Sequence, residues 1–383
     1  MSLIDDMLNA FVQIACNPKS QLNKYLAMDR KVIGCFPYYV PEEIVEAADM
    51  VPFGVWGCQG RAISAAKEYF ATFYCSLAQL NLEMGLSGVL DGLSGVIVTS
   101  LCDTLRPLSQ NFKVGVSSLP FIYLAQPQNR RMDCGIEFSL LQYHGIKDKL
   151  EEISGVPITN KKLWDAIEVY NNSRAERRRF VKLANLHPEA VTPTQRNAVL
   201  KSAYFMTKAE HSWMLSRLNR ELDKLSPSTW MGIRIVTSGI LADNWNLLRI
   251  FENVGMSIAA DDVAHESRSF RVDVPNADDP LYALALQFAA QGQDPLLYDP
   301  DIKSRPIHVV DLVKDSGAQG VVVLLMQFCD PEEMEYPYLK KELESAGVPS
   351  VAIGIDHQMK DFEQARTLMQ TFADVLTDKS NRC

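Results

Sequence analysis

The sequence lacks the motifs by which many enzymes bind nucleotides or single metal ions. It contains no G-x-G-x-x-G, no G-x-x-x-x-G-K-[ST], no H-E-x-x-H and no C-x-x-C. We therefore expect no dinucleotide bound through a Rossmann fingerprint, no ATP hydrolysis at a P-loop and no ordinary structural zinc site. The sequence also shows no signal peptide and no long apolar span, which predicts a cytoplasmic protein without a membrane partner.

Cysteine and positive charge are both scarce. Eight cysteines in 383 residues are too few for a disulfide framework, so free thiols in a reducing compartment are expected. The 47 acidic and 38 basic residues give a formal net charge of −9, which argues against a nucleic-acid partner. One short basic run, Arg177 to Arg179, is interpreted as a solvated helix face.

Strand and helix patterns alternate in two parts of the chain, which predicts an α/β fold with parallel sheets. The chain is too long for one ordinary core. We expect two Rossmann-like (flavodoxin-like) lobes joined by a helical connector, with domains at 1–132, 133–228 and 229–383. The expected strands are 31–36, 50–56, 96–102, 120–125, 232–240, 256–260, 320–327 and 349–355.

Two of these strands end in the same pattern, a hydrophobic run that is followed by Cys-Asp. The first leads to Cys102 and the second to Cys329, where Asp330 is the expected N-cap of a helix. The carboxyl ends of parallel strands are where open α/β sheets bind ligands, so these two thiols predict one site between facing lobes. Cys75, expected inside a helical stretch from 63 to 90, is a third candidate, and Cys35 also ends a strand.

Cysteines without a clear histidine partner suit a soft metal centre. Iron–sulfur clusters accept thiolates, and three thiolates leave one iron for another ligand. A helix N-terminus beside a thiol, as after Cys329, would favour the thiolate. The alternative is a small buried hydrophobe, the usual role of a lone cysteine. His265, which follows a strand, is a lesser candidate for acid–base catalysis.

Eight ordered motifs resemble the 2-hydroxyacyl-CoA dehydratases, most closely the β subunits of the 2-hydroxyglutaryl-CoA branch. The resemblance covers nearly the whole chain. The motifs are GCFPYYVPEE at 34–43, VWGC at 55–58, FYC at 73–75, LCDTLRP at 101–107, SQNFK at 109–113, DD at 261–262, ESR at 266–268 and QFCDPEE at 327–333.

This resemblance implies a 4Fe-4S cluster held by Cys75, Cys102 and Cys329 in the cleft between the lobes. It gives Cys58 no ligand role. It also implies an α subunit as heterodimer partner, an acyl-CoA substrate and a separate ATP-hydrolysing iron–sulfur activator. In the family the activator supplies one electron, the thioester becomes a ketyl radical anion, and hydroxide leaves. A flavin such as FMN, bound by some relatives, has no support in the sequence.

Two alternatives stay open at this point. One is a subunit of the benzoyl-CoA reductase type, in which the electron is consumed. The other is a non-enzymatic, two-lobed small-molecule-binding protein without a cluster. If the acyl group is dicarboxylic, its distal carboxylate needs a partner; Arg106 and Arg268 are candidates, although a structural ion pair is the favoured role for both.

Overall fold

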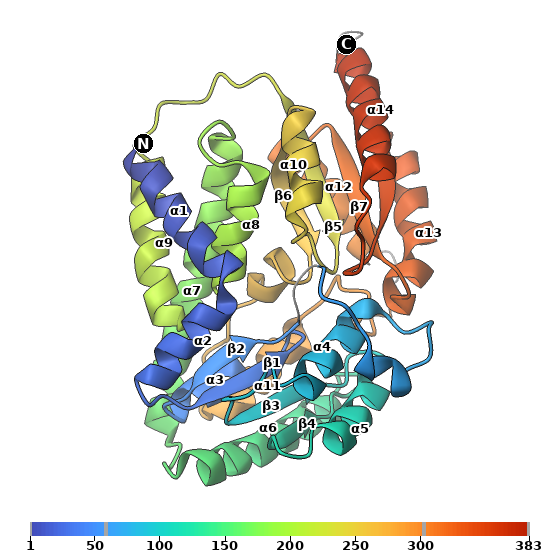
Figure 1. The fold of residues 1–383 in the computed structure, drawn as a ribbon. Coiled ribbons are helices and arrows are strands. Elements are labelled where there is room, and N and C mark those ends of the chain that lie inside the picture. Colours follow the sequence, from blue (N-terminus) through green and yellow to red (C-terminus); the bar gives the residue numbers. More distant parts are fainter. Residues whose placement is uncertain (1, 57–59, 301–303, 381–383) are drawn as a thin grey trace.

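The computed structural model describes residues 2–56, 60–300 and 304–380 and contains two four-stranded parallel sheets (Figure 1). Both sheets have the strand order 2-1-3-4, as in flavodoxin-like folds. The first, ordered β2-β1-β3-β4, consists of β1 (Val32–Phe36), β2 (Val51–Gly54), β3 (Gly95–Thr99) and β4 (Phe121–Leu124). The second, ordered β6-β5-β7-β8, consists of β5 (Ile233–Gly239), β6 (Met256–Val263), β7 (Gly320–Met326) and β8 (Ser350–Ile355).

All eight strands lie where the sequence predicts them, and the expected α/β class with two parallel-sheet lobes is confirmed. The repeated strand order is what an internal duplication would produce. The short strand-like run at 156–159 is not a strand but part of the link between two helices. Pro157 interrupts this run and cannot donate a ladder hydrogen bond, and no described strand pairs with it.

Helices cover both faces of the first sheet. Val96 and Val98 contact one apolar cluster and Ile97 another, because successive side chains of a strand point to opposite faces. The first cluster includes Leu77 and Phe112 of α4 and α5. The helices of this lobe are α3 (Glu42–Ala47), the 3₁₀ turn η1 (Ala65–Glu68), α4 (Ser76–Leu86), α5 (Leu105–Gly115), α6 (Asp133–Ser154) and α11 (Pro280–Ala290).

Helix α11 reaches the first lobe from the second half of the chain. Its residues Leu281 and Leu284 join Ile33 and Ile97 in the cluster that also holds α6 residues such as Tyr143. The chain therefore leaves the second sheet after β6, covers the outer face of the first sheet, and returns. The nearly uniform apolarity of this helix fits its burial.

The second sheet is covered in the same manner. Ile235 and Leu324 face one pair of helices, and Val236 and Val323 face the other. The first pair is α10 (Trp245–Asn253) and α14 (Glu363–Ser380); the second pair is α12 (Ser304–Ser316) and α13 (Asp330–Ser345). A short 3₁₀ turn, η2 (Ser267–Phe270), follows β6.

A helical layer flanks both lobes, along the left of the molecule in Figure 1. Phe11 of the first helix and Phe180, Leu215 and Leu218 of the later helices share one apolar cluster. The layer consists of α1 (Leu3–Cys16), α2 (Pro18–Ala27), α7 (Asn160–Leu186), α8 (Pro193–Ser202) and α9 (Lys208–Leu222). In the part of the chain that is described, no helix is long and apolar enough to cross a membrane.

A buried ion network links the end of β6 to the start of α13. Asp262 accepts hydrogen bonds from Arg268 at 3.1 and 3.0 Å and from Arg305 at 2.7 Å. Glu332, in the first turn of α13, lies 3.1 Å from Arg268 and 3.2 Å from Arg305. Burial alone would raise the pKa of Asp262, but the surrounding guanidinium groups lower it well below its usual range. The network is therefore ionised and fully paired.

The same network reaches the first lobe through Asp294. Its carboxylate lies 3.5 Å from Arg268 and accepts hydrogen bonds from the Tyr38 hydroxyl at 3.4 Å and the Tyr39 hydroxyl at 2.9 Å. Both tyrosines follow β1, so a chain of polar contacts joins the carboxyl end of the first sheet to the second. Arg268 is thus a structural ion-pair partner, as favoured from the sequence.

Replacing Arg268 with methionine is expected to lower the free energy of unfolding by about 3–5 kcal/mol. The change leaves buried carboxylates without their cation, which is strongly destabilising. Urea denaturation followed by circular dichroism would measure it. As a control, Lys161→Met removes an exposed pair with Asp165, where the two side chains are 83% and 60% exposed, and should cost less than about 1 kcal/mol. Equal effects of the two substitutions would contradict the role assigned to the network.

Candidate functional site

Three cysteines lie at the N-termini of three helices. Cys75 is the N-cap of α4, and Cys329 is the N-cap of α13. Cys102 lies in the turn between β3 and α5, where its carbonyl accepts a 3.1 Å hydrogen bond from the Leu105 N–H. Cys75 is therefore not inside a helix as expected, because α4 begins only at Ser76. The predicted N-cap Asp330 is likewise the first residue of α13.

The three thiols come from both lobes and lie near one another. Cys329 interacts electrostatically with Cys75 and Cys102, and Cys75 with Cys102. All three are partly buried and pack against one apolar cluster. Nearby, the Ser76 hydroxyl lies 3.9 Å from the Met326 sulfur and accepts a 3.2 Å hydrogen bond from the His357 N–H. The carboxyl ends of the two sheets thus face one another across the thiols.

Burial keeps these thiols protonated. Desolvation, followed by the neighbouring Cys102, raises the pKa of Cys75 to about 12. Burial and Glu332 raise the pKa of Cys329 well above its usual range, and burial raises that of Cys102. Backbone N–H groups of the three helices lower each pKa but do not compensate for desolvation. The start of α13 favours the thiolate at Cys329, as expected, but burial outweighs this effect and keeps the pKa of the thiol high.

The arrangement does not suit a single metal ion. Among the residues that the structure describes, no three His, Cys, Asp or Glu side chains are grouped closely enough to hold one. A single zinc ion needs all its sulfur ligands about 2.3 Å from one point. A cluster of several irons accepts each thiolate at a different iron and needs wider spacing. Three converging thiols, with helix N–H groups directed at them, therefore fit an iron–sulfur cluster.

One of the remaining cysteines, Cys35, is separate from this site. Cys35 is buried within β1 and its thiol donates to the Ile33 carbonyl at 3.7 Å, as a packed core residue would. Cys58, named in the motif comparison, lies outside the described residues.

The predicted histidine, His265, lies in a buried aromatic cage formed by Tyr38, Trp56 and Tyr204. Its Nδ1 is 3.2 Å from the Ile240 carbonyl, and its ring centroid is 4.5 Å from that of Trp56. Burial lowers the pKa of His265 to about 4, despite the nearby Asp243 and the Ile240 carbonyl, so the ring is neutral at pH 7. A neutral ring can accept a proton at Nε2, which has no hydrogen-bond partner in the described chain.

The sequence analysis missed His357. It follows β8 directly, is fully buried, and neither ring nitrogen has a hydrogen-bond partner among the described residues. Burial lowers the pKa of His357, although Asp243 opposes this. Its position was open to the argument that found Cys102, since Asp356-His357 also follows the carboxyl end of a predicted strand.

Neither arginine considered for substrate binding lies in a cavity of this site. Arg268 has no exposed side-chain surface and is held by three carboxylates. The Arg106 side chain is 49% exposed on the first turn of α5 and lies 4.0 Å from Asp103. Arg106 is close in sequence to Cys102, but it faces solvent.

The fold is that of a two-lobed α/β protein in which three cysteines from both lobes lie near one another. The chain matches the family described as 2-hydroxyglutaryl-CoA dehydratase, D-component, over residues 37–376. It is 50% identical to (R)-2-hydroxyglutaryl-CoA dehydratase subunit beta of Acidaminococcus fermentans, over 97% of this chain and 100% of that protein. It is also 44% identical to the (R)-phenyllactyl-CoA dehydratase beta subunit of Clostridium sporogenes, over 98% and 100%.

A third relative, the lactoyl-CoA dehydratase subunit beta of Anaerotignum propionicum, is 38% identical over 98% of this chain and 100% of that protein. The chain belongs to the 2-hydroxyglutaryl-CoA dehydratase D-component family. The resemblance carried by the eight motifs is confirmed, and so is the predicted enzyme class, because these relatives are subunits of 2-hydroxyacyl-CoA dehydratases. A non-enzymatic binding protein is no longer a competing interpretation.

The neutral state of His265 predicts a loss of stability in mild acid. The unfolded histidine binds a proton near pH 6.5, whereas the folded one does so only near pH 4. Its contribution is therefore complete above pH 6.5 and falls by about 2 kcal/mol at pH 5. Urea denaturation at pH 8, 6 and 5 would show a shallower pH dependence for His265→Gln than for the unmodified chain. Parallel curves would show that folding does not lower the pKa of His265.

Proposed function

We propose that this chain is the β subunit of a (R)-2-hydroxyglutaryl-CoA dehydratase, which removes water from 2-hydroxyglutaryl-CoA to give glutaconyl-CoA. The observation that supports this most is the convergence of three helix-terminal thiols in a chain of this family. The relatives differ in acyl group, so the choice of substrate rests on the higher identity to the hydroxyglutaryl enzyme.

In this proposal Cys75, Cys102 and Cys329 hold a 4Fe-4S cluster, and the fourth iron is left to another ligand. When bound, the cluster supplies one-electron transfer. The chain's own contribution is to hold three thiols in a dry, partly buried place and to direct helix N–H groups at them. These N–H groups favour negative charge, and thus stabilise a thiolate-ligated cluster once the protons have left.

A one-electron route answers a specific chemical difficulty. The β-proton of a 2-hydroxyacyl thioester is not acidified by the carbonyl, so ordinary acid–base help is insufficient. One-electron reduction of the thioester to a ketyl radical anion allows hydroxide to leave and makes the β-proton removable, after which the electron is recovered. We propose that a separate ATP-hydrolysing iron–sulfur activator supplies this electron, because this chain has no nucleotide motif.

We propose that an α subunit docks where the cysteines approach the surface. Exposed apolar side chains flank the site: Phe73 is 64% exposed, Phe328 38% and Met334 74%. Phe328 directly precedes Cys329 and has a φ of +63°, an unusual backbone conformation for an aromatic residue. Its N–H donates to Glu333 at 3.0 Å. Apolar side chains held exposed beside a redox site are well placed to be covered by a partner that shares the electron.

The proposed location is the cytoplasm. The six cysteines that the structure describes are all free thiols, and three of them are needed as ligands. A reducing compartment keeps such thiols available for metal.

Serine at position 75, 102 or 329 is expected to abolish most cluster binding while both lobes stay folded. A serine hydroxyl is a poor ligand for iron compared with a thiolate. Iron and acid-labile sulfide would be measured in anaerobically purified protein, and folding would be checked by circular dichroism. As matched controls, Cys16→Ser and Cys134→Ser change exposed thiols and should keep full iron content. Full iron occupancy in any of the three site variants would remove that cysteine from the ligand set.

The substrate assignment predicts a preference for a dicarboxylic acyl group. The complex with its α subunit, supplied with activator, ATP and reductant, should convert 2-hydroxyglutaryl-CoA in competition with 2-hydroxyisocaproyl-CoA and phenyllactyl-CoA. The chain without these components should show no turnover. A tenfold higher kcat/KM for either apolar substrate, about 1.4 kcal/mol of discrimination, would overturn the assignment. Reduction of benzoyl-CoA in place of dehydration would establish the reductase alternative.

A further inference from the structure

One arginine of the basic run at 177–179 is not on the solvated face expected from the sequence. Arg178 and Arg179 pair with Asp273 and Asp223 at the surface. Arg177 is only 4% exposed. Helix α7 turns it inward, where its guanidinium carbon lies 4.9 Å from the centre of the Phe270 ring. The expectation is therefore wrong for Arg177, because η2 covers this turn of the helix.

Arg177 has no acidic partner of its own. Its Nε donates to the Ser173 carbonyl at 3.3 Å, one helical turn away. In the described ranges no carboxylate oxygen lies within 4.0 Å of its guanidinium nitrogens. Burial lowers the pKa of Arg177 to about 10, which still leaves it charged at pH 7. A buried charge without a counter-ion costs several kcal/mol, so a structural role for this arginine is poorly supported.

The acids nearby are already occupied. Glu42 accepts hydrogen bonds from the Lys208 ammonium at 2.7 Å and from the Tyr170 hydroxyl at 3.2 Å. Glu43 pairs with Arg174. Glu46, which does not line the cavity, interacts with Arg30 and Lys208. Among the charged side chains of the lining, three cations therefore face two carboxylates, and Arg177 is the cation in excess.

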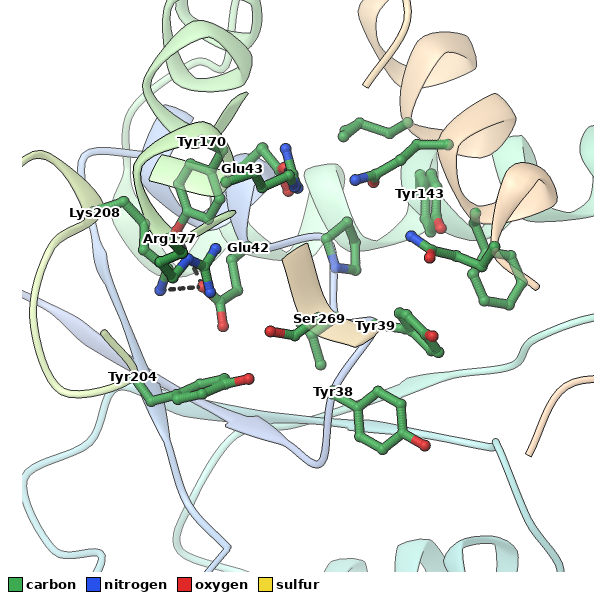
Figure 2. A pocket seen from close by; sticks show the side chains of 17 residues that line it. Tyr38, Tyr39, Glu42, Glu43, Tyr143, Tyr170, Arg177, Tyr204, Lys208 and Ser269 are labelled. Atoms are coloured by element: carbon green, nitrogen blue, oxygen red, sulfur yellow. Dashed lines mark hydrogen bonds and ion pairs between the residues drawn. The ribbon is translucent and has the colours of Figure 1, made fainter. Parts of the chain in front are cut away.

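Arg177 lines a cavity that we call the tyrosine pocket, after its five tyrosines. It has about 640 Å³ of space not filled by atoms, including the part at its mouth that is open to solvent. Figure 2 shows Arg177, Glu42 and Lys208 at one end and Tyr39 and Tyr143 at the other. The five tyrosines are Tyr38, Tyr39, Tyr143, Tyr170 and Tyr204.

The aromatic end of the tyrosine pocket is apolar, but it also contains a hydrogen-bond donor. Leu284 and Phe288 of α11 add to its lining. The Tyr143 hydroxyl has no hydrogen-bond partner in the described chain, and burial raises the pKa of Tyr143, so the group is a neutral donor. A cavity with an excess cation at one end and aromatic rings at the other is complementary to an amphipathic anion.

We propose that the tyrosine pocket binds a small monocarboxylate with an apolar body, whose carboxylate pairs with Arg177 and whose body lies among the tyrosine rings. The single negative charge of a monocarboxylate balances the excess positive charge of Arg177. A phosphate dianion would instead leave a surplus negative charge beside Glu42 and Glu43. A planar guanidinium also matches a carboxylate with two parallel hydrogen bonds. The proposal does not depend on the cysteine site, which contributes no residue to this lining.

The test is calorimetric titration of the full chain, in the complex in which it is purified, with phenylacetate, its neutral amide phenylacetamide, acetate and inorganic phosphate. Phenylacetate should bind at least tenfold more tightly than phenylacetamide, because only the acid pairs with Arg177, and more tightly than acetate, which lacks the aromatic body. Arg177→Met should lose this binding. Arg178→Met is the matched control, since it removes the neighbouring charge outside the pocket, and it should bind phenylacetate normally.

Thermal stability separates a binding role from a structural one. Because Arg177 is buried and unpaired, Arg177→Met should have an unchanged or higher melting temperature, and Arg177→Lys should keep part of the binding. Equal binding of acid and amide, tighter binding of phosphate, undiminished binding by Arg177→Met, or no binding of phenylacetate would each overturn the proposal. So would a lower melting temperature in both Arg177 variants, because it would assign the arginine to the structure.

Discussion

The interaction on which this structure most depends is the buried pairing of Asp262 and Glu332 with Arg268 and Arg305. Asp262 ends β6 and Glu332 begins α13, so the four charges fix the distance between a strand end and a helix start. Cys329 is the N-cap of that helix. Buried charges are costly unless every one is paired. Pairing all four charges therefore restricts α13 to one position. This position also fixes the thiol of Cys329, which the second lobe contributes.

The charge state of the three thiols also depends on burial and on the charged groups around them. The site lies among helix N-termini, which favour anions, and close to Glu332 and Asp330, which oppose them. Desolvation is the largest of these effects, and it keeps the three thiols neutral. Because the three thiols are neutral, folding does not have to bury three like charges at once.

The sequence predicted the strands and the positions of Cys102 and Cys329 after two of them well, because each rests on a local signal. A β-branched run followed by Cys-Asp locates Cys102 and Cys329 at strand ends without knowledge of the rest of the chain. Cys75 was preferred over Cys35 only through its motif, since the irregular turn before α4 has no strand to reveal it. Arg177 and Asp262 depend on partners far away in sequence. η2 covers Arg177, Arg305 pairs with Asp262, and the apolar periodicity of a local segment does not identify such distant partners.

Helix α11 has a consequence for how the protein is made. The first sheet is complete once residue 124 has been synthesised, but the helix that closes its outer face comes from residues 280–290. Chains leave the ribosome from the N-terminus at about 5–20 residues per second. The nascent first lobe must therefore wait, for roughly ten seconds or more at this rate, with the outer face around Ile33 and Ile97 incompletely covered. The first lobe therefore cannot complete its core on its own, and the two lobes reach their final form together.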